Sequence, residues 1–341
     1  PVDHSLILSY KESQSGQTLE QGITEAGSTA SWIAAGTSYA TRGVPMVPFY
    51  TYYSMFGFQR VGDLLWAASD SRARGFLLGA TSGRTTLLGE GLQHQDGHSL
   101  VLASVIPACE AYDPAFAYEL AAIIEHGLKR MYVDNEDIYY YLTLYNEAYA
   151  QPPKPEGSDQ GILDGLYRWA PAPTGTTYRS TILFSGPSHS AAREAQTILA
   201  EDYDVGAELW SATSYKKLRE EAMSVDRWNS LHPGEGPRVP LVTRQLEGTL
   251  GPVIAVTDYM RTVPDQISRW VPRSYTSLGT DGYGRSDTRE SLREFFETDA
   301  NHVVTATLSA LARDQRIGPG VVREAIERYG IDPDVGDPWK R

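Results

Sequence analysis

A continuous apolar run from Gly75 to Ala80 passes directly into a polar, glycine-rich stretch that ends at Ser99. Apolar residues without polar alternation are typical of a strand buried on both faces, as in a parallel sheet covered by helices. The polar stretch leaves the carboxyl end of that strand, which is where open α/β sheets place their ligands. The sequence therefore predicts an α/β fold with a candidate site in residues 83–99.

The stretch 83–99 gathers reactive side chains among four glycines. These side chains are Glu90, His94, Asp96 and His98. Glycine permits positive φ and lets the backbone approach a ligand closely. A loop without a function is polar too, but it rarely places glutamate, histidine and aspartate within nine residues. This composition favours a functional site over a plain surface loop.

One chemistry that this stretch could support is metal binding. His94, Asp96 and His98 alternate along the chain, and an extended segment points alternate side chains in the same direction. Imidazole and carboxylate are plausible ligands of zinc or iron. A metal hydrolase is therefore one open interpretation, in which Glu90 would order the site or relay protons.

Strand and helix patterns alternate along the chain, which predicts two doubly wound α/β domains with largely parallel sheets. The predicted strands are residues 46–50, 75–80, 137–144, 181–184, 207–210 and 253–256. The predicted helices are residues 17–35, 56–71, 115–130, 188–202, 301–313 and 319–329, with one more that ends at Phe296. We expect Asp113 to cap the helix at 115–130, and Ser286 or Asp287 to cap the one ending at Phe296.

A proline-rich segment divides the chain into two parts. Residues 151–161 contain three prolines, which stiffen a linker, and glycines near its end. The predicted organisation is a first domain over 1–150, this linker, and a second domain over 162–341.

Composition excludes several classes of function. The 341 residues carry a formal net charge of −13, so no basic surface offsets the repulsion of a nucleic acid. No apolar run approaches the roughly 20 residues that span a bilayer, and no signal peptide is apparent, so we expect no membrane partner and a cytoplasmic location. Cys109 is the single cysteine, which excludes an internal disulfide, and we expect it to be a buried small hydrophobe.

Several long segments resemble one family. They are residues 50–63, 85–99, 106–118, 139–149 and 278–293. Together they resemble the homodimeric bacterial E1 component of pyruvate dehydrogenase, a thiamine-diphosphate enzyme related to transketolase. The resemblance implies a pyrimidine-binding domain followed by a transketolase carboxy-terminal-like domain. It implies oxidative decarboxylation of pyruvate with reductive acetylation of a lipoyl group on the E2 acetyltransferase, in a homodimer whose site lies at the subunit interface.

The same resemblance implies roles for particular residues. The segment 21–27 is similar to the one whose glutamate, here Glu25, hydrogen-bonds N1′ of the aminopyrimidine. Tyr53 and Phe56 match positions beside the aminopyrimidine, and Tyr53 can also present a hydroxyl to the substrate. His94 matches a histidine that faces the reacting carbon, and Glu90 is expected to support the cofactor site. The resemblance thus gives Glu25, Tyr53 and His94 catalytic roles.

One expected motif is missing from the sequence. The family binds the diphosphate through Mg²⁺ with an aspartate in Gly-Asp-Gly and a later asparagine, and this chain has no Gly-Asp-Gly. We therefore expect no metal ligand here and the Mg²⁺ site in an upstream domain, this chain being the carboxy-terminal part of a longer polypeptide. Two alternatives remain: a transketolase-like enzyme with another donor, and a truncated, non-catalytic scaffold.

A second polar, glycine-rich stretch lies far along the chain. It contains Asp281, Arg285 and Asp287 and follows a short predicted strand. We expect Arg285 to pair with an aspartate, which is a structural role. The sequence assigns no chemistry to these three residues.

Overall fold

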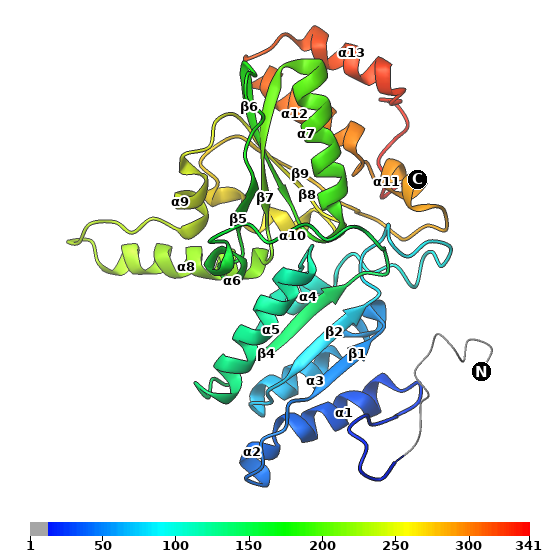
Figure 1. The fold of residues 1–341 in the computed structure, drawn as a ribbon, viewed down its shortest axis with the longest axis vertical. Helices are drawn as coiled ribbons and strands as arrows, with labels where there is room; N and C mark the ends of the chain where they lie inside the picture. Colours follow the sequence, from blue (N-terminus) through cyan, green and yellow to red (C-terminus); the bar gives the residue numbers. More distant parts are fainter. Residues whose placement is uncertain (1–12) are drawn as a thin grey trace.

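The computed structural model describes residues 13–341, which form two α/β units stacked along the long axis of the molecule (Figure 1). Residues 1–12 of the predicted first domain lie outside the described residues. The strands of the first unit are β1 (Phe49–Tyr52), β2 (Phe76–Ala80), β3 (Cys109–Tyr112) and β4 (Tyr139–Leu144). They are all parallel, in the order β1-β2-β4-β3.

Helices cover both faces of this first sheet. The helical elements are α1 (Glu25–Gly36), α2 (Ser38–Thr41), η1 (Ser54–Phe56), α3 (Phe58–Asp70), α4 (Ser99–Ser104) and α5 (Ala117–Tyr132). The three consecutive tyrosines of β4 show why both faces are apolar: Tyr139 and Tyr141 pack with α1, α3 and α4, whereas Tyr140 packs with α5. All three are fully buried, as expected of a central parallel strand.

The second unit has five strands, β5 (Tyr167–Ala170), β6 (Tyr178–Phe184), β7 (Val205–Ser211), β8 (Val253–Val256) and β9 (Tyr275–Leu278). Their order is β5-β7-β6-β8-β9, and only the edge strand β5 is antiparallel. One face carries α7 (His189–Tyr203), α12 (Ala300–Arg313) and α13 (Pro319–Tyr329). The other face carries α8 (Tyr215–Leu231), α9 (Leu241–Glu247) and α10 (Thr262–Asp265). Short elements α6 (Asp159–Asp164), η2 (Gly186–Ser188), η3 (Ser268–Trp270) and α11 (Arg289–Phe295) complete the chain.

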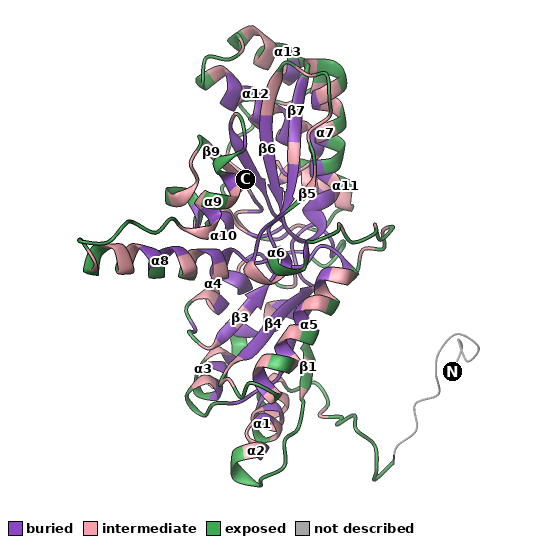
Figure 2. Ribbon diagram, turned by 60° about the vertical axis from the view of Figure 1, so that its left-hand side comes forward, coloured by how far each residue is buried: buried purple, intermediate pink, exposed green. Residues whose placement is uncertain are grey.

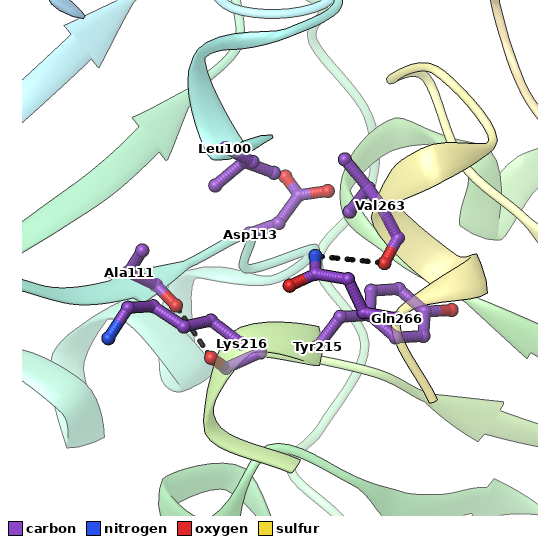
Figure 3. Close-up of a pocket in the computed structure, with 8 residues that line it drawn as sticks. Leu100, Ala111, Asp113, Tyr215, Lys216, Val263 and Gln266 are labelled. Carbon is purple, nitrogen blue, oxygen red and sulfur yellow. Dashed lines mark hydrogen bonds between the residues drawn. The ribbon is translucent and has the colours of Figure 1, made fainter. Parts of the chain in front are cut away.

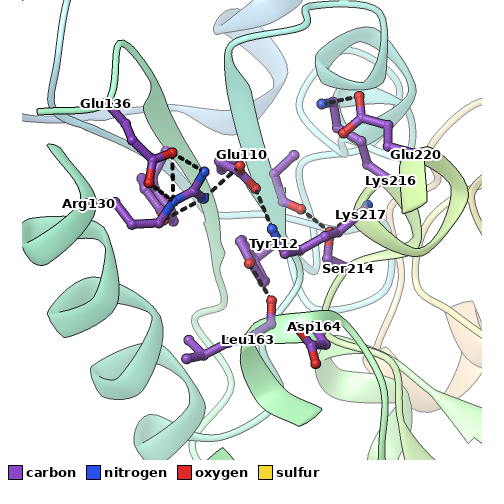
Figure 4. A network of polar contacts seen from close by, with 12 residues as sticks. Glu110, Tyr112, Arg130, Glu136, Leu163, Asp164, Ser214, Lys216, Lys217 and Glu220 are labelled. Carbon is purple, nitrogen blue, oxygen red and sulfur yellow. Dashed lines mark hydrogen bonds and ion pairs between the residues drawn. The ribbon is translucent and has the colours of Figure 1, made fainter. Parts of the chain in front are cut away.

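The two units share one apolar core. A single cluster of buried side chains runs from α3 and α4 of the first unit to α8, α9 and β8 of the second, and buried strands of both sheets are seen in Figure 2. Glu110 of β3 forms two ion pairs, one within the first unit and one with the second: it lies 2.7 Å from Arg130 of α5 and 3.3 Å from Lys217 of α8 (Figure 4). The Ser214 hydroxyl also donates to the Ala111 carbonyl at 2.6 Å.

The α/β class and the parallel sheets predicted from the sequence are confirmed, but several element ends are wrong. The first helix begins at Glu25 instead of residue 17, because Thr24 caps it with a hydrogen bond from the Gly27 N–H. The sequence analysis also missed α8, in which charged and polar residues are interspersed among the apolar ones along all 17 residues. The predicted linker, residues 151–161, overlaps the first residues of α6, which begins at Asp159. The predicted domain boundaries stay a prediction.

Both predicted helix caps are wrong. Asp113 does not cap α5, because the Glu119 carboxylate accepts hydrogen bonds from the Ala115 and Phe116 N–H groups. Thr288, a neighbour of the two predicted residues, caps α11 through a bond from the Ser291 N–H.

Two further findings concern the class of protein. Cys109 is fully buried, which confirms the predicted buried small hydrophobe, and burial raises the pKa of its thiol to about 12. No helix in residues 13–341 is both long and apolar enough to cross a bilayer.

Candidate functional site

The stretch after β2 forms a closed loop at the carboxyl edge of the first sheet. An isolated β-bridge between Gly83 and Asp96 joins its two ends. Gly83 has φ +82°, and a Cβ there would lie 2.0 Å from Asp258 Oδ2, so the position accepts only glycine. We call residues 83–98 the glycine-rich loop. Its exposed tip is residues 88–90 and 92–93, while residues 82–87 and 95–97 are buried.

Three rings meet where this loop passes the start of α3. The Tyr53 and Phe56 rings stack at 5.5 Å between centroids, and the His94 imidazole meets each of them edge-on at 5.4 Å. Burial raises the pKa of the Tyr53 phenol, with Glu90 as a further cause. Rings in these arrangements can hold a flat heteroaromatic ligand by offset or edge contacts.

Two carboxylates flank the rings. Glu90 Oε2 lies 3.1 Å from His94 Nδ1, but this close contact is not aligned as a hydrogen bond, and Nδ1 has no hydrogen-bond partner. On the other side, Arg60 lies 4.1 Å from the centre of the Phe56 ring and pairs with Glu25 Oε1 at 3.0 Å. The structure therefore joins all five predicted site residues through successive contacts, although they come from three separate segments.

Asp96 and His98 do not join this cluster. Asp96 is fully buried and accepts hydrogen bonds from the N–H groups of His98 and Ser99 at 2.9 Å, which fixes the start of α4. It also accepts from the Ser54 hydroxyl and, at 3.3 Å, from Tyr259 of the second unit. His98 Nε2 instead lies 2.6 Å from Gln59 Oε1, and burial lowers the pKa of its imidazole.

The metal interpretation thus has no support in the geometry. Residues 13–341 contain no group of three or more histidine, cysteine, aspartate and glutamate side chains arranged to hold a metal ion. The alternating sequence pattern fails because the segment around Asp96 turns into α4 and does not continue as an extended chain.

The sequence reasoning did not connect two buried carboxylates with the loop: Asp258 was not named, and Asp113 was expected only as a helix cap. Asp258 follows β8 and accepts hydrogen bonds from the Thr85 N–H at 3.2 Å; burial raises the pKa of its carboxyl to about 7. Asp113 follows β3 and accepts from Thr143 at 2.7 Å and from Tyr145, and burial raises its pKa as well. An aspartate one or two residues after a buried strand was the available signal, since it marks the carboxyl edge of a sheet.

Asp113 also lines a cavity between the units, large enough for about one water molecule (Figure 3). Asp113 Oδ2 has no hydrogen-bond partner. The cavity lies away from the ring cluster, so it is no part of the predicted cofactor site.

The second glycine-rich stretch is structural, but its predicted pairing is wrong. Asp281 pairs with Arg261 at 2.7 Å, not with Arg285. The Arg285 guanidinium instead donates to the Arg341 carbonyl and lies 5.1 Å from the centre of the Phe295 ring. The prediction failed because Arg261, on a separate segment after β8, is brought against Asp281.

The two α/β units, with their largely parallel sheets, have the transketolase-like fold. A transketolase-like C-terminal domain model matches residues 165–299. The fold resembles Campylobacter jejuni transketolase with a TM-score of 0.60 and 15% identity, over 81% of this chain and 38% of that one. A structure described as "Split gene transketolase, inactive beta4 tetramer" matches with a TM-score of 0.56 and 16% identity, over 83% of this chain and 81% of that one.

The chain belongs to the pyruvate dehydrogenase E1 component family. The model of the middle domain of that component matches residues 1–152. The E1 component of Pseudomonas aeruginosa is 52% identical over 99% of this chain and 38% of its own length. The E1 component of Mycolicibacterium smegmatis is 55% identical over 97% of this chain and 36% of its own length. That of Escherichia coli K12 is 49% identical over 99% of this chain and 38% of its own length. The chain thus spans little more than a third of the length of these relatives.

Proposed function

We propose that this chain carries the pyrimidine-binding part of a pyruvate dehydrogenase E1 component. The reaction is thiamine-diphosphate-dependent oxidative decarboxylation of pyruvate, followed by reductive acetylation of the lipoyl group of E2. The observation that carries the proposal is the convergence of Glu25, Tyr53, Phe56, Glu90 and His94 at the carboxyl edge of a parallel sheet. The family membership and about 50% identity to E1 components support the choice of reaction.

The residues present fit the pyrimidine end of the cofactor. When bound, thiamine diphosphate supplies an electron sink for the decarboxylation of a 2-oxo acid. Tyr53 and Phe56 would hold the flat ring, since their own rings stack at 5.5 Å and offer apolar faces. The Glu25 carboxylate, 17% exposed and oriented by Arg60, would hold a proton at N1′ of the aminopyrimidine. Glu90, with 47% of its side chain exposed, would support the same site.

His94 would act on the substrate and not on the cofactor. Its imidazole is 30% exposed and is fixed edge-on against Tyr53 and Phe56. Nδ1 is buried and lies 3.1 Å from Glu90 Oε2, so the other ring nitrogen would donate to a developing oxyanion or move a proton.

The diphosphate and Mg²⁺ require residues that this chain does not supply. The sequence has no Gly-Asp-Gly motif, and residues 13–341 have no clustered metal ligands. We place the Mg²⁺ ligands in another domain, across the open side of the ring cluster. Exposed apolar residues on the segments that carry the site support a second protein surface, because Ile23, two positions from Glu25, and Leu92, two positions from His94, are 102% and 56% exposed. We propose a cytoplasmic homodimer whose site lies at this interface and whose partner is the lipoyl domain of E2.

The test is calorimetric titration of the 341-residue chain with thiamine diphosphate and Mg²⁺. Stacking and one hydrogen bond supply only a few kcal/mol before the entropy of association is subtracted, so we expect millimolar binding at best and no decarboxylation. This chain covers 81% of the split-gene transketolase chain, which is described as an inactive tetramer. That description supports the expectation that a chain of this length is inactive alone. The complete enzyme is the positive control. Micromolar affinity, or pyruvate decarboxylation by the chain alone, would show that a phosphate site lies within these residues.

A substrate panel on the complete enzyme separates this proposal from its alternatives. Pyruvate with a lipoyl acceptor is the expected pair. Turnover of sugar phosphates in its place indicates a transketolase-like enzyme with another donor. A complete gene product that fails to bind thiamine diphosphate indicates a non-catalytic scaffold.

A further inference from the structure

A glutamine beside His94 ties the glycine-rich loop to the second unit. Gln95 is 1% exposed, and its amide pairs with the backbone of Arg285: Oε1 accepts from the N–H at 2.8 Å and Nε2 donates to the carbonyl at 2.7 Å. Nε2 also donates to the Leu87 carbonyl at 2.5 Å, within the loop. The pairing with both an N–H and a carbonyl group fixes which end of the amide is which.

Glycines let the two segments approach this closely. A Cβ at Gly284 would lie 2.7 Å from both Gln95 Oε1 and the Gly91 carbonyl oxygen. Gly91 has φ +77°, and a Cβ there would lie 2.7 Å from Ser286 Oγ. The segment 284–286 therefore lies directly against the backbone that carries the tip of the loop.

Other contacts with the second unit hold the base of the loop, and one reaches its tip, where the Ser286 hydroxyl donates to the Gly89 carbonyl at 3.1 Å. Arg84 donates to the carbonyls of Thr280, at 2.6 Å, and of Gly282, and the Met260 N–H donates to the Gly97 carbonyl at 2.9 Å. Between these anchors, residues 88–90 and 92–93 are exposed. His94 belongs to the turn at this tip, since its N–H donates to the Gly91 carbonyl at 3.2 Å. An exposed segment with few buried contacts opens easily unless a specific bond holds it.

We propose that Gln95 is a positioning residue, through which the segment 284–286 of the second unit holds His94 in place for catalysis. The inference rests on the proposed function, because it assumes that His94 acts on the substrate. The segment 284–286 of the second unit thereby gains an indirect role in the reaction, through the turn that carries His94. Gln95 itself reaches only backbone groups, so it acts through the turn and not on the reacting atoms.

The main test is Gln95→Met in the complete enzyme, which keeps the length of the side chain and removes three hydrogen bonds. The control is Gln196→Met, because Gln196 of α7 likewise donates to two backbone carbonyls, at 2.8 and 3.1 Å, away from the loop. We expect hydrogen exchange in residues 86–94 to become at least tenfold faster in Gln95→Met only. We also expect kcat to fall at least tenfold, with the affinity for thiamine diphosphate changed less than twofold.

Two further variants keep the inference testable if Gln95→Met folds poorly. Gly284→Ala disturbs the same pairing from the second unit, so we expect the same faster exchange and lower kcat. In Gln95→Glu, a protonated carboxyl has one O–H donor and one carbonyl acceptor, which reproduces the pairing with Arg285. For Gln95→Glu, the ratio of its kcat to that of the wild type should therefore rise as the pH falls from 8 to 6.

The outcomes separate this inference from the proposed function. Wild-type exchange and kcat in the folded variants overturn it, and so does faster exchange with unchanged kcat. A wild-type enzyme that does not decarboxylate pyruvate contradicts the proposed function, while the exchange data still report whether Gln95 holds the loop.

Discussion

Asp258 makes the stability of this protein depend on pH in an unusual direction. Its carboxyl is fully buried, and burial raises its pKa from 3.8 to about 7, with Asp113 adding to the rise and Arg293 opposing it. The folded chain therefore binds this proton more tightly than the unfolded chain. By linkage, the contribution of Asp258 to the free energy of unfolding falls as the pH rises from about 4 to about 7, and it is constant above that range.

The size of the effect follows from the two pKa values. At 1.36 kcal/mol per pKa unit, the difference between 3.8 and about 7 corresponds to about 4 kcal/mol in total. About 2.5 kcal/mol of this falls between pH 5 and pH 8. An asparagine at this position carries no ionisable proton, and its amide oxygen can still accept from the Thr85 N–H. Asp258→Asn should therefore gain stability relative to the wild type as the pH rises.

The assay is denaturant unfolding of the 341-residue chain at several pH values between 5 and 8, followed by circular dichroism. We expect the stability of Asp258→Asn minus that of the wild type to rise by about 2.5 kcal/mol over this range. The matched control is Asp287→Asn, because Asp287 is exposed and bonds only the neighbouring Thr288 N–H. A difference that stays flat, or that falls with pH, refutes the reasoning about Asp258.

Two predictions concern the complete enzyme. Glu25→Gln should leave the circular dichroism spectrum unchanged and slow deprotonation at C2 of the cofactor by about 10²–10⁴, the usual cost of losing a positioned acid or base; normal turnover in the folded variant would remove Glu25 from the mechanism. His94→Ala should bind thiamine diphosphate with nearly unchanged affinity, while the flux from pyruvate to acetyl-lipoyl falls sharply. Loss of cofactor affinity with normal turnover per bound cofactor would make His94 a binding residue.

Local pattern was enough to predict the central strands of both sheets, because these strands are short apolar runs, but the edge strands β3 and β5 were not predicted. The buried strands β2 and β8 lie where the sequence placed them. The first helix was predicted too long because Leu19 and Ile23 continue its apolar spacing upstream, yet both are highly exposed and precede the Thr24 cap. A single capping hydrogen bond decided where that helix begins, and hydrophobic spacing does not report it.

The candidate site was only half predictable, for a physical reason. Glu25, Tyr53, Phe56 and His94 were named through motifs, and the structure brings them together. What holds the loop was not predicted, because each contact joins residues far apart in sequence. Gln95 and Arg285 are 190 positions apart, and their meeting depends on how two sheets pack against each other.

The core that α3, α4, α8 and α9 share has a practical consequence for dissecting this protein. A protease that cleaves the proline-rich segment near residues 152–156 would cut one exposed connection and leave the interface between the two units intact. The two pieces would then co-elute under native conditions and come apart only in denaturant. Either unit expressed alone would expose a large apolar face to water. We therefore expect it to aggregate unless the other unit is produced with it.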